Sequence, residues 1–239
     1  MLSERIGVLF RKCKNILQRE GLFTCIKQIF LFLGKYFFNY GNYYIYENNL
    51  NQTVDKENIK TEIQNLELKI LSTPEQIDTL NSEGYDINSF GAVSLDAEDV
   101  KKRVNKDMVL FCIFVNKEIA HTTWVALSRE AKMNADYLPY AIDFENEACI
   151  GHHVTNPKYR RQGHLTYTTY QIHKFFREKG FLRARFSVPT NIIAVQKSEA
   201  KLGSRILAKG RYLKILWWTF WKEEPVKELK YDSRVRTIT

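Results

Sequence analysis

The sequence predicts an α/β domain in which strands and helices alternate, over about residues 61–222. Segments with alternating apolar and polar positions are interspersed with segments of helical periodicity, and this pattern is typical of α/β proteins. The 239 residues are 44% hydrophobic and 13% aromatic, which is enough apolar material for one core. The expected order is strand, two helices, three strands, helix, strand, helix and two strands.

Several element ends carry local signals. Thr73-Pro74-Glu75-Gln76 predicts a helix start, because Thr caps, Pro fits the first helical position and Gln completes a capping box. Asp96 and the acidic residues after it predict the start of a second helix. Asn116-Lys117 predicts a short hairpin connection, and Gly180 predicts a helix end. The expected strands are 62–70, 109–115, 119–127, 148–155, 182–188, 205–208 and 212–222, and the later helices are 163–179 and 191–202.

Residues 1–50 differ in composition from the rest and are expected to form an extension outside the domain. They contain seven basic and three acidic residues and a run, 29–46, rich in Phe and Tyr. Apolar residues from Leu2 to Leu17 recur at helical spacing opposite Arg and Lys, which predicts an amphipathic helix. This extension lies in a lipid interface, or it packs on the main domain or on a second subunit to form a homodimer. A linker over 51–60 follows, and 223–239 is a charged tail.

The charge and the cysteine content indicate which partners and which cellular compartment to expect. The formal net charge of +9 favours anionic partners. The four cysteines form no CxxC pair, so neither a disulfide framework nor a zinc site is expected. Basic residues interrupt the first twenty positions, which argues against a secretory signal. The expected location is cytoplasmic, or peripheral at the inner face of the membrane if the extension binds lipid. A nucleic-acid partner is not expected, because no nucleic-acid-binding motif is visible.

Residues 152–166 carry the clearest chemical signal. A strand ends, a Pro-containing turn follows, then two Arg and a Gly, and a helix begins at once. Such a helix start presents backbone N–H groups to an anion, Gly163 allows close approach, and Arg160 and Arg161 add positive charge. The segment is therefore expected to hold a pyrophosphate.

Arg160-Arg161-Gln162-Gly163-His164-Leu165 resembles the pyrophosphate-binding signature of the GNAT superfamily of acyl-CoA-dependent N-acyltransferases. That signature is Gln or Arg, two residues, Gly, one residue, then Gly or Ala, so Leu165 departs from it. Residues 154–159 are similar to the family's lead-in, and residues 191–203 resemble its Asn-led helix and Lys-Leu-Gly exit, with Ser204 in place of Phe. The resemblance implies a GNAT-like mixed sheet over about 61–222.

The resemblance also implies acetyl-CoA as co-substrate and assigns residues to it. The strand end at 152–154 would pair with the pantetheine arm, the backbone amides of 162–166 with the two Arg would hold the pyrophosphate, and Asn191 would contact the cofactor. An acceptor amine would then attack the thioester directly, with neither a covalent enzyme intermediate nor a metal. The implied cofactor residues are His152, Val154, Arg160, Arg161, Gln162, Gly163, His164, Leu165, Thr166 and Asn191.

The attacking amine must be neutral, which calls for a general base. His152 is the preferred candidate and Glu147 the second. His153 points to the opposite face of the strand, and a base supplied by water or the substrate is the alternative. The general acid is unassigned, because Ser198 stands near the place where the family often has Tyr. Cys149 is interpreted as a small hydrophobic residue.

The predicted function is therefore N-acetyl transfer to the primary amine of a small molecule, for example an aminosugar of surface-polysaccharide synthesis. The alternatives are a non-catalytic GNAT-like acyl-CoA-binding scaffold and a basic nucleic-acid-binding protein. The aromatic run at 215–221 is interpreted as sheet core with a subunit contact, or as the lining of an acceptor pocket.

Overall fold

The computed structural model describes residues 38–52, 65–93 and 95–226. Two compact units divide the chain: one contains the described residues 38–42 and 211–222, and the other contains 43–210 and 223–226. The expected amphipathic helix and most of the 51–60 linker lie outside the described residues. None of the helices in the described part is long and apolar enough to cross a membrane.

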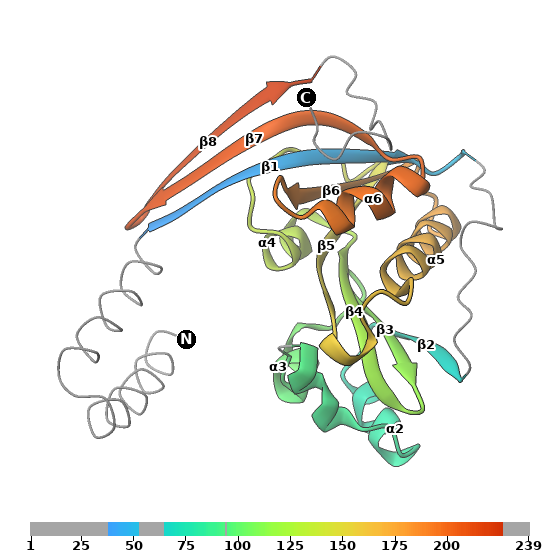
Figure 1. Cartoon of the computed structure of the whole chain (residues 1–239). Helices are drawn as coiled ribbons and strands as arrows, with labels where there is room; N and C mark the ends of the chain where they lie inside the picture. The colour runs from blue at the N-terminus through green and yellow to red at the C-terminus, as the bar shows by residue number, and fades with distance from the viewer. Residues whose placement is uncertain (1–37, 53–64, 94, 227–239) are drawn as a thin grey trace. The chain divides into compact units, whose positions relative to one another are not determined.

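An eight-stranded mixed sheet forms the framework, in the order β2-β3-β4-β5-β6-β1-β7-β8 (Figure 1). The pairs β2–β3, β3–β4, β4–β5 and β6–β1 are antiparallel, and β5–β6 is parallel. The expected α/β class is confirmed. The elements are β1 Phe38–Asn49, β2 Leu66–Leu71, α2 Glu75–Ser82, the 3-10 helix η2 Ile87–Val93, α3 Ala97–Arg103, β3 Met108–Val115, β4 Glu118–Ala126, α4 Arg129–Ala135, β5 Glu147–Thr155, the 3-10 helix η3 Pro157–Tyr159, α5 His164–Glu178, β6 Arg183–Pro189, α6 Ile193–Lys201, β7 Arg205–Ile215 and β8 Trp218–Pro225.

Helices cover both faces of the sheet in the larger unit. On one face, Ile172 and Phe176 of α5 pack with Phe111 of β3. On the other face, Leu110 of β3 packs in a second cluster with side chains of α2, α3 and α4. Successive residues of β3 thus serve opposite layers, as the period of two in a strand requires. This arrangement buries every residue of β3.

The predicted element ends are largely confirmed. Asp96 caps α3 by accepting hydrogen bonds from the N–H groups of Glu98 (2.9 Å) and Asp99 (3.3 Å). Asn116 and Lys117 both have positive φ in the β3–β4 hairpin. At α2 the expected Thr73 side-chain cap does not form. Instead, Gln76 Oε1 accepts from the N–H groups of Thr73 (3.0 Å) and Ser72 (2.6 Å).

The structure differs from the expected extension of residues 1–50 at its C-terminal end. Residues 38–49 form β1, which pairs with β6 so that Tyr46 lies opposite Phe186. The two rings stack with centroids 5.3 Å apart. The described part of the aromatic run, residues 38–46, belongs to β1, and its Tyr44 and Tyr46 side chains lie in the core.

The expected break at Lys209-Gly210 is wrong. β7 continues through both residues, because Ile206, Ala208 and Gly210 keep the alternation of buried positions. The chain turns instead at Leu216, whose φ is 57°. As a result, β7 and β8 form one long hairpin.

Candidate functional site

The central feature of the site is the separation of β5 from β6. Their parallel ladder runs only from Glu147–Arg183 to Cys149–Arg185, and β6 continues along β1 up to Pro189. On its other edge β5 pairs with β4, with a register shift opposite Thr123–Val125. Such an irregularity bends a strand and re-aims its side chains. Beyond Cys149, β5 therefore diverges from β6 and leaves an opening in the sheet.

A groove of about 540 Å³ lies at the carboxyl end of β5. The end of β5, the following loop, the start of α5 and α6 line this groove, which we call the cradle. Eight of the ten residues that the resemblance assigns to the cofactor lie in its lining: Val154, Arg160, Arg161, Gln162, Gly163, His164, Leu165 and Thr166.

Local interactions hold the cradle loop in shape. The Asn156 side chain accepts from the N–H of Lys158 (3.1 Å) and donates to the carbonyl of Ile119 (3.0 Å). Tyr159 donates to Glu118 Oε2 (2.7 Å). Gly163, with φ of 81°, is the N-cap of α5 and supplies no side-chain acceptor. The first N–H groups of α5 therefore have no side-chain cap, which is the arrangement that binds an anion.

His164 lines the cradle with an unsatisfied ring. Its side chain is 2% exposed, and neither ring nitrogen has a hydrogen-bond partner among the described residues. Burial lowers the pKa of His164, so the ring is neutral near pH 7. A neutral imidazole offers one donor and one acceptor, and a buried polar group without partners favours a ligand that supplies them.

A second groove, of about 370 Å³, which we call the acceptor groove, reaches the same opening. It shares His153 and Ile192 with the cradle. Tyr43 and Tyr137 form part of its wall, with their hydroxyl oxygens 2.8 Å apart. The remaining lining residues are Ala135, Asp136, Leu138, Gly151, His152, Ser187 and Pro189. The two grooves therefore meet at the β5–β6 separation.

His152 and His153 stand at this junction with different surroundings. His152 lines the acceptor groove. Burial, and then the nearby charge of Arg103, lower its pKa, so the ring is neutral near pH 7. Burial lowers the pKa of His153 further, to about 4, and its ring stacks on His121. His152 is therefore the better placed of the two to accept a proton.

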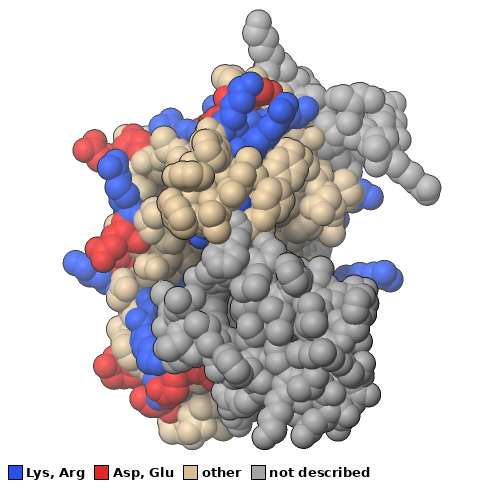
Figure 2. Space-filling view, turned by 90° about the vertical axis from the view of Figure 1, so that its left-hand side faces the viewer, with Lys and Arg blue, Asp and Glu red and all other residues tan. Residues whose placement is uncertain are grey.

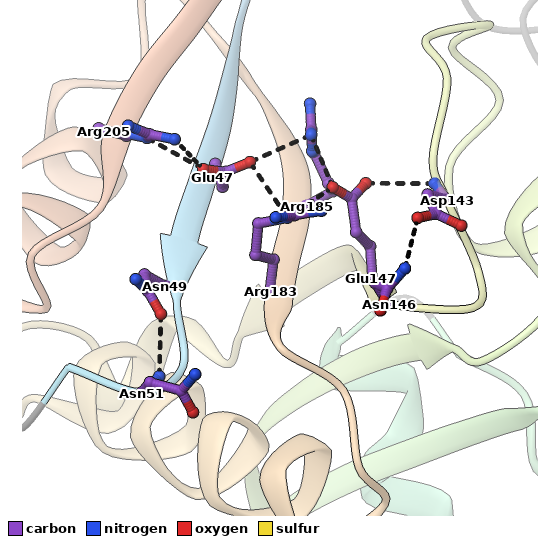
Figure 3. Close-up of polar contacts among 9 residues, drawn as sticks. All are labelled: Glu47, Asn49, Asn51, Asp143, Asn146, Glu147, Arg183, Arg185 and Arg205. Atoms are coloured by element: carbon purple, nitrogen blue, oxygen red, sulfur yellow. Dashed lines mark hydrogen bonds and ion pairs between the residues drawn. The ribbon is translucent and has the colours of Figure 1, made fainter.

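Glu147, the second candidate base, lines neither groove. Arg183 Nε and Arg185 Nη2 donate to Glu147 Oε1 at 2.9 and 2.7 Å (Figure 3). Burial would raise the pKa of this carboxyl, but these hydrogen bonds lower it overall. Glu47 lies on the other side of the same arginines and also binds Arg205. Glu147 belongs to this ion-pair network across β5, β6, β1 and β7, and it remains a carboxylate.

Other predicted residues lie away from the junction. Asn191 is exposed in the β6–α6 turn and lines neither groove, whereas its neighbour Ile192 lines both. Ser198 lines the cradle and shares a hydrogen bond of 2.8 Å with Thr166. Cys149 is fully buried, and burial raises the pKa of its thiol to about 12. The Cys149 interpretation as a small buried residue agrees with this environment.

The side of the acceptor groove next to α4 was not predicted from the sequence. Asp136 and Tyr137 follow α4 directly, and Ser187 donates to Asp136 Oδ2 (2.7 Å). Ser128 caps α4 by accepting from the N–H of Ala131. Ser128 followed by Arg-Glu-Ala is a typical helix start and could have predicted α4. The sequence alone does not indicate that this helix lies beside β6.

The sequence matches no family model and no curated protein. Among solved structures, the chain is similar to a GCN5-related N-acetyltransferase from Sphaerobacter thermophilus (TM-score 0.49, 11% identity, 87% of this chain and 59% of that chain). It is also similar to a GCN5-related N-acetyltransferase-like protein from Streptococcus suis (0.45, 12%, 83% and 69%). A third is an aminoglycoside acetyltransferase from an uncultured soil metagenomic sample, in complex with sisomicin (0.41, 17%, 57% and 87%). The match thus spans less than two thirds of the Sphaerobacter chain.

The mixed sheet and the loop-to-helix motif expected from the sequence are both present in the chain. The sheet is mixed, its parallel pair β5–β6 separates beyond Cys149, and the Arg160–Leu165 motif stands at the start of α5. The domain was expected to span residues 61–222, but β1, which precedes this range, is also a strand of the sheet.

Proposed function

We propose that this chain is an acetyl-CoA-dependent N-acetyltransferase acting on a primary amine. One observation carries the proposal: the cradle and the acceptor groove meet at the β5–β6 separation, with His152 and His153 at the junction. Two substrates entering from the two grooves would bring their reacting atoms together there, which is the arrangement that direct group transfer needs.

The cradle fits the pyrophosphate of coenzyme A. The uncapped N–H groups at the start of α5 and the exposed Arg160 and Arg161 suit a phosphate, and the unpartnered ring of His164 adds a buried polar contact. The β5 edge at 152–154, freed from β6, would bind the amide groups of the pantetheine arm. The bound cofactor would supply an activated acetyl thioester.

In the acceptor groove, His152 is the proposed general base. Its neutral ring would take a proton from the entering ammonium group, directly or through a water, and leave a nucleophilic amine facing the opening. Tyr43 and Tyr137 would orient the acceptor through their hydroxyl groups and ring faces. The size of the groove suits a small molecule, and an aminosugar of surface-polysaccharide synthesis is the acceptor class we propose. We place this reaction in the cytoplasm.

Calorimetric titration with acetyl-CoA and with CoA tests the cradle. We expect micromolar binding by the full chain and a loss of roughly tenfold or more in the Arg160→Ala, Arg161→Ala variant, which removes two charged contacts. The control is Lys102→Ala, Lys106→Ala, which removes the same charge from exposed positions outside both grooves and should bind normally. No binding by the wild-type chain would overturn the proposal.

Release of free thiol in a screen of primary amines then tests catalysis. We expect His152→Ala to lower kcat by about 100-fold or more, the usual contribution of a general base, while acetyl-CoA binding is retained. Glu147→Gln should leave the pH profile of kcat unchanged, because Glu147 lines neither groove. Cofactor binding without turnover on any amine would favour the scaffold alternative.

A further inference from the structure

The smaller unit presents an unusual concentration of exposed apolar side chains. Trp217 is 74% exposed, Trp218 57% and Phe220 55%, and Ile215 and Leu216 are also exposed. These five residues, which we call the aromatic tip, surround the turn of the β7–β8 hairpin. Phe38 and Tyr40 of β1, in the same unit, are more than half exposed as well. The sequence suggested that this segment is sheet core or lines an acceptor pocket. The aromatic tip is instead exposed, and it lines neither the cradle nor the acceptor groove.

Single exposed apolar residues need no explanation, but a contiguous group of this kind marks an interaction surface. Figure 2, which faces the hairpin turn, shows uncharged side chains gathered there. The rings of Trp217 and Trp218 lie 5.7 Å apart and 62° from parallel, so they form one bulky edge. Trp, Tyr and Phe side chains favour the headgroup region of a bilayer, because they combine a large apolar surface with a polar or polarisable edge.

The charge of this unit favours an anionic partner. Its described residues, 38–42 and 211–222, include Arg211, Lys214 and Lys222 but no Asp or Glu, and the acidic Glu223 and Glu224 of β8 lie farther along the strand from the hairpin turn. A second copy docking through the same surface would bring two such basic sets together, which is unfavourable. A surface of anionic lipid complements both the rings and the charge.

We propose that the aromatic tip inserts into the headgroup layer of an anionic membrane, with the neighbouring basic residues on lipid phosphates. The chain then binds the membrane surface through a β-hairpin, without spanning it. This inference is independent of the proposed acetyl transfer, because none of the residues involved lines the cradle or the acceptor groove.

Co-sedimentation of the full chain with vesicles tests the proposal. The probes are phosphatidylcholine vesicles with and without phosphatidylglycerol, at low and high salt. We expect binding to the anionic vesicles that weakens with salt, and a fall of roughly tenfold or more in the partition coefficient of the Trp217→Ser, Trp218→Ser, Phe220→Ser variant. The control, Met133→Ser with Leu182→Ser, removes exposed apolar side chains of the larger unit and should bind like the wild type.

A second variant separates charge from insertion. Lys214→Glu keeps every ring of the aromatic tip and should weaken binding to anionic vesicles by roughly fivefold or more. Circular dichroism melting checks that the triple variant and Lys214→Glu both remain folded. Three results would overturn the proposal: no binding by the wild type, unchanged binding by the triple variant, or a wild-type dimer in sedimentation equilibrium that the triple variant disrupts without any vesicle binding.

Discussion

Replacing Gly151 by Ala tests the contact that sets one wall of the acceptor groove. Gly151 lies where the β4–β5 register shifts, directly against the end of α4. A Cβ atom at this position would lie 2.6 Å from the carbonyl oxygen of Ala135 and 2.7 Å from its Cβ, whereas ordinary contacts begin at 3.4 Å. The obstacle is backbone, so it cannot rotate away, and α4 must move by about 0.8 Å or the strand must bend.

Overpacking of this kind costs about 1–3 kcal/mol. For a chain of this size we expect Tm to fall by about 2–12 °C. Urea denaturation should give the same loss in the free energy of unfolding. Because α4 carries Asp136 and Tyr137 at its end, the KM for the acceptor should rise, whereas acetyl-CoA affinity should remain, since the cradle does not include Gly151.

Gly91→Ala is the matched control. A Cβ there meets no atom within 4 Å, and Gly91 has no positive φ, so its stability should change by less than about 0.5 kcal/mol or rise slightly. If Gly151→Ala is as stable as Gly91→Ala, the close approach of β5 to α4 is not a feature of the folded protein.

Three further predictions concern buried groups and a cap. Burial raises the pKa of Glu199 to about 7 from 4.5, so its contribution to stability is present below pH 4.5 and is lost as pH rises to 7. Glu199→Gln should therefore gain up to about 3 kcal/mol over the wild type across that range in urea denaturation, and a flat difference would contradict this. Burial also raises the thiol pKa of Cys112 and Cys149. In a variant with Cys13 and Cys25 changed to Ser, Cys112 and Cys149 should react with a disulfide reagent only as fast as the chain unfolds. Rapid labelling of the native protein would be inconsistent with this. Asp96→Ala should cost about 1 kcal/mol of unfolding free energy, because α3 loses its cap; an unchanged urea midpoint would argue against that role.

The parts of the fold that local signals govern could be predicted from the sequence. The Asn116-Lys117 hairpin, the Asp96 cap and the Gly163–Gly180 helix limits follow from the preferences of a few neighbouring residues. The cradle belongs to this class as well, because strand end, loop and helix start are continuous in the chain. A single segment of about fifteen residues therefore holds most of the lining of the cradle.

The acceptor groove could not be predicted in the same way. Its wall joins Tyr43 of β1, Tyr137 after α4 and Ser187 of β6, which are distant in the sequence. The role of Glu147 could not be predicted either. A carboxylate at the start of β5 suggested a general base, but two arginines of β6 pair with it. Long-range pairing decided both cases, and the period of two along each strand does not reveal which strand lies beside it.

The position of β1 has a consequence for how the protein is made. β1 leaves the ribosome early, but its partner β6 starts about 134 residues after β1 ends. At the usual pace of synthesis that delay is on the order of 7–27 s, during which Tyr44 and Tyr46 have no native surface to cover them. Late, long-range closure of this kind is slow and exposes the nascent chain to aggregation. For the same reason, a truncation that starts at residue 51 would not yield a trimmed domain, because it would remove an interior strand of the sheet.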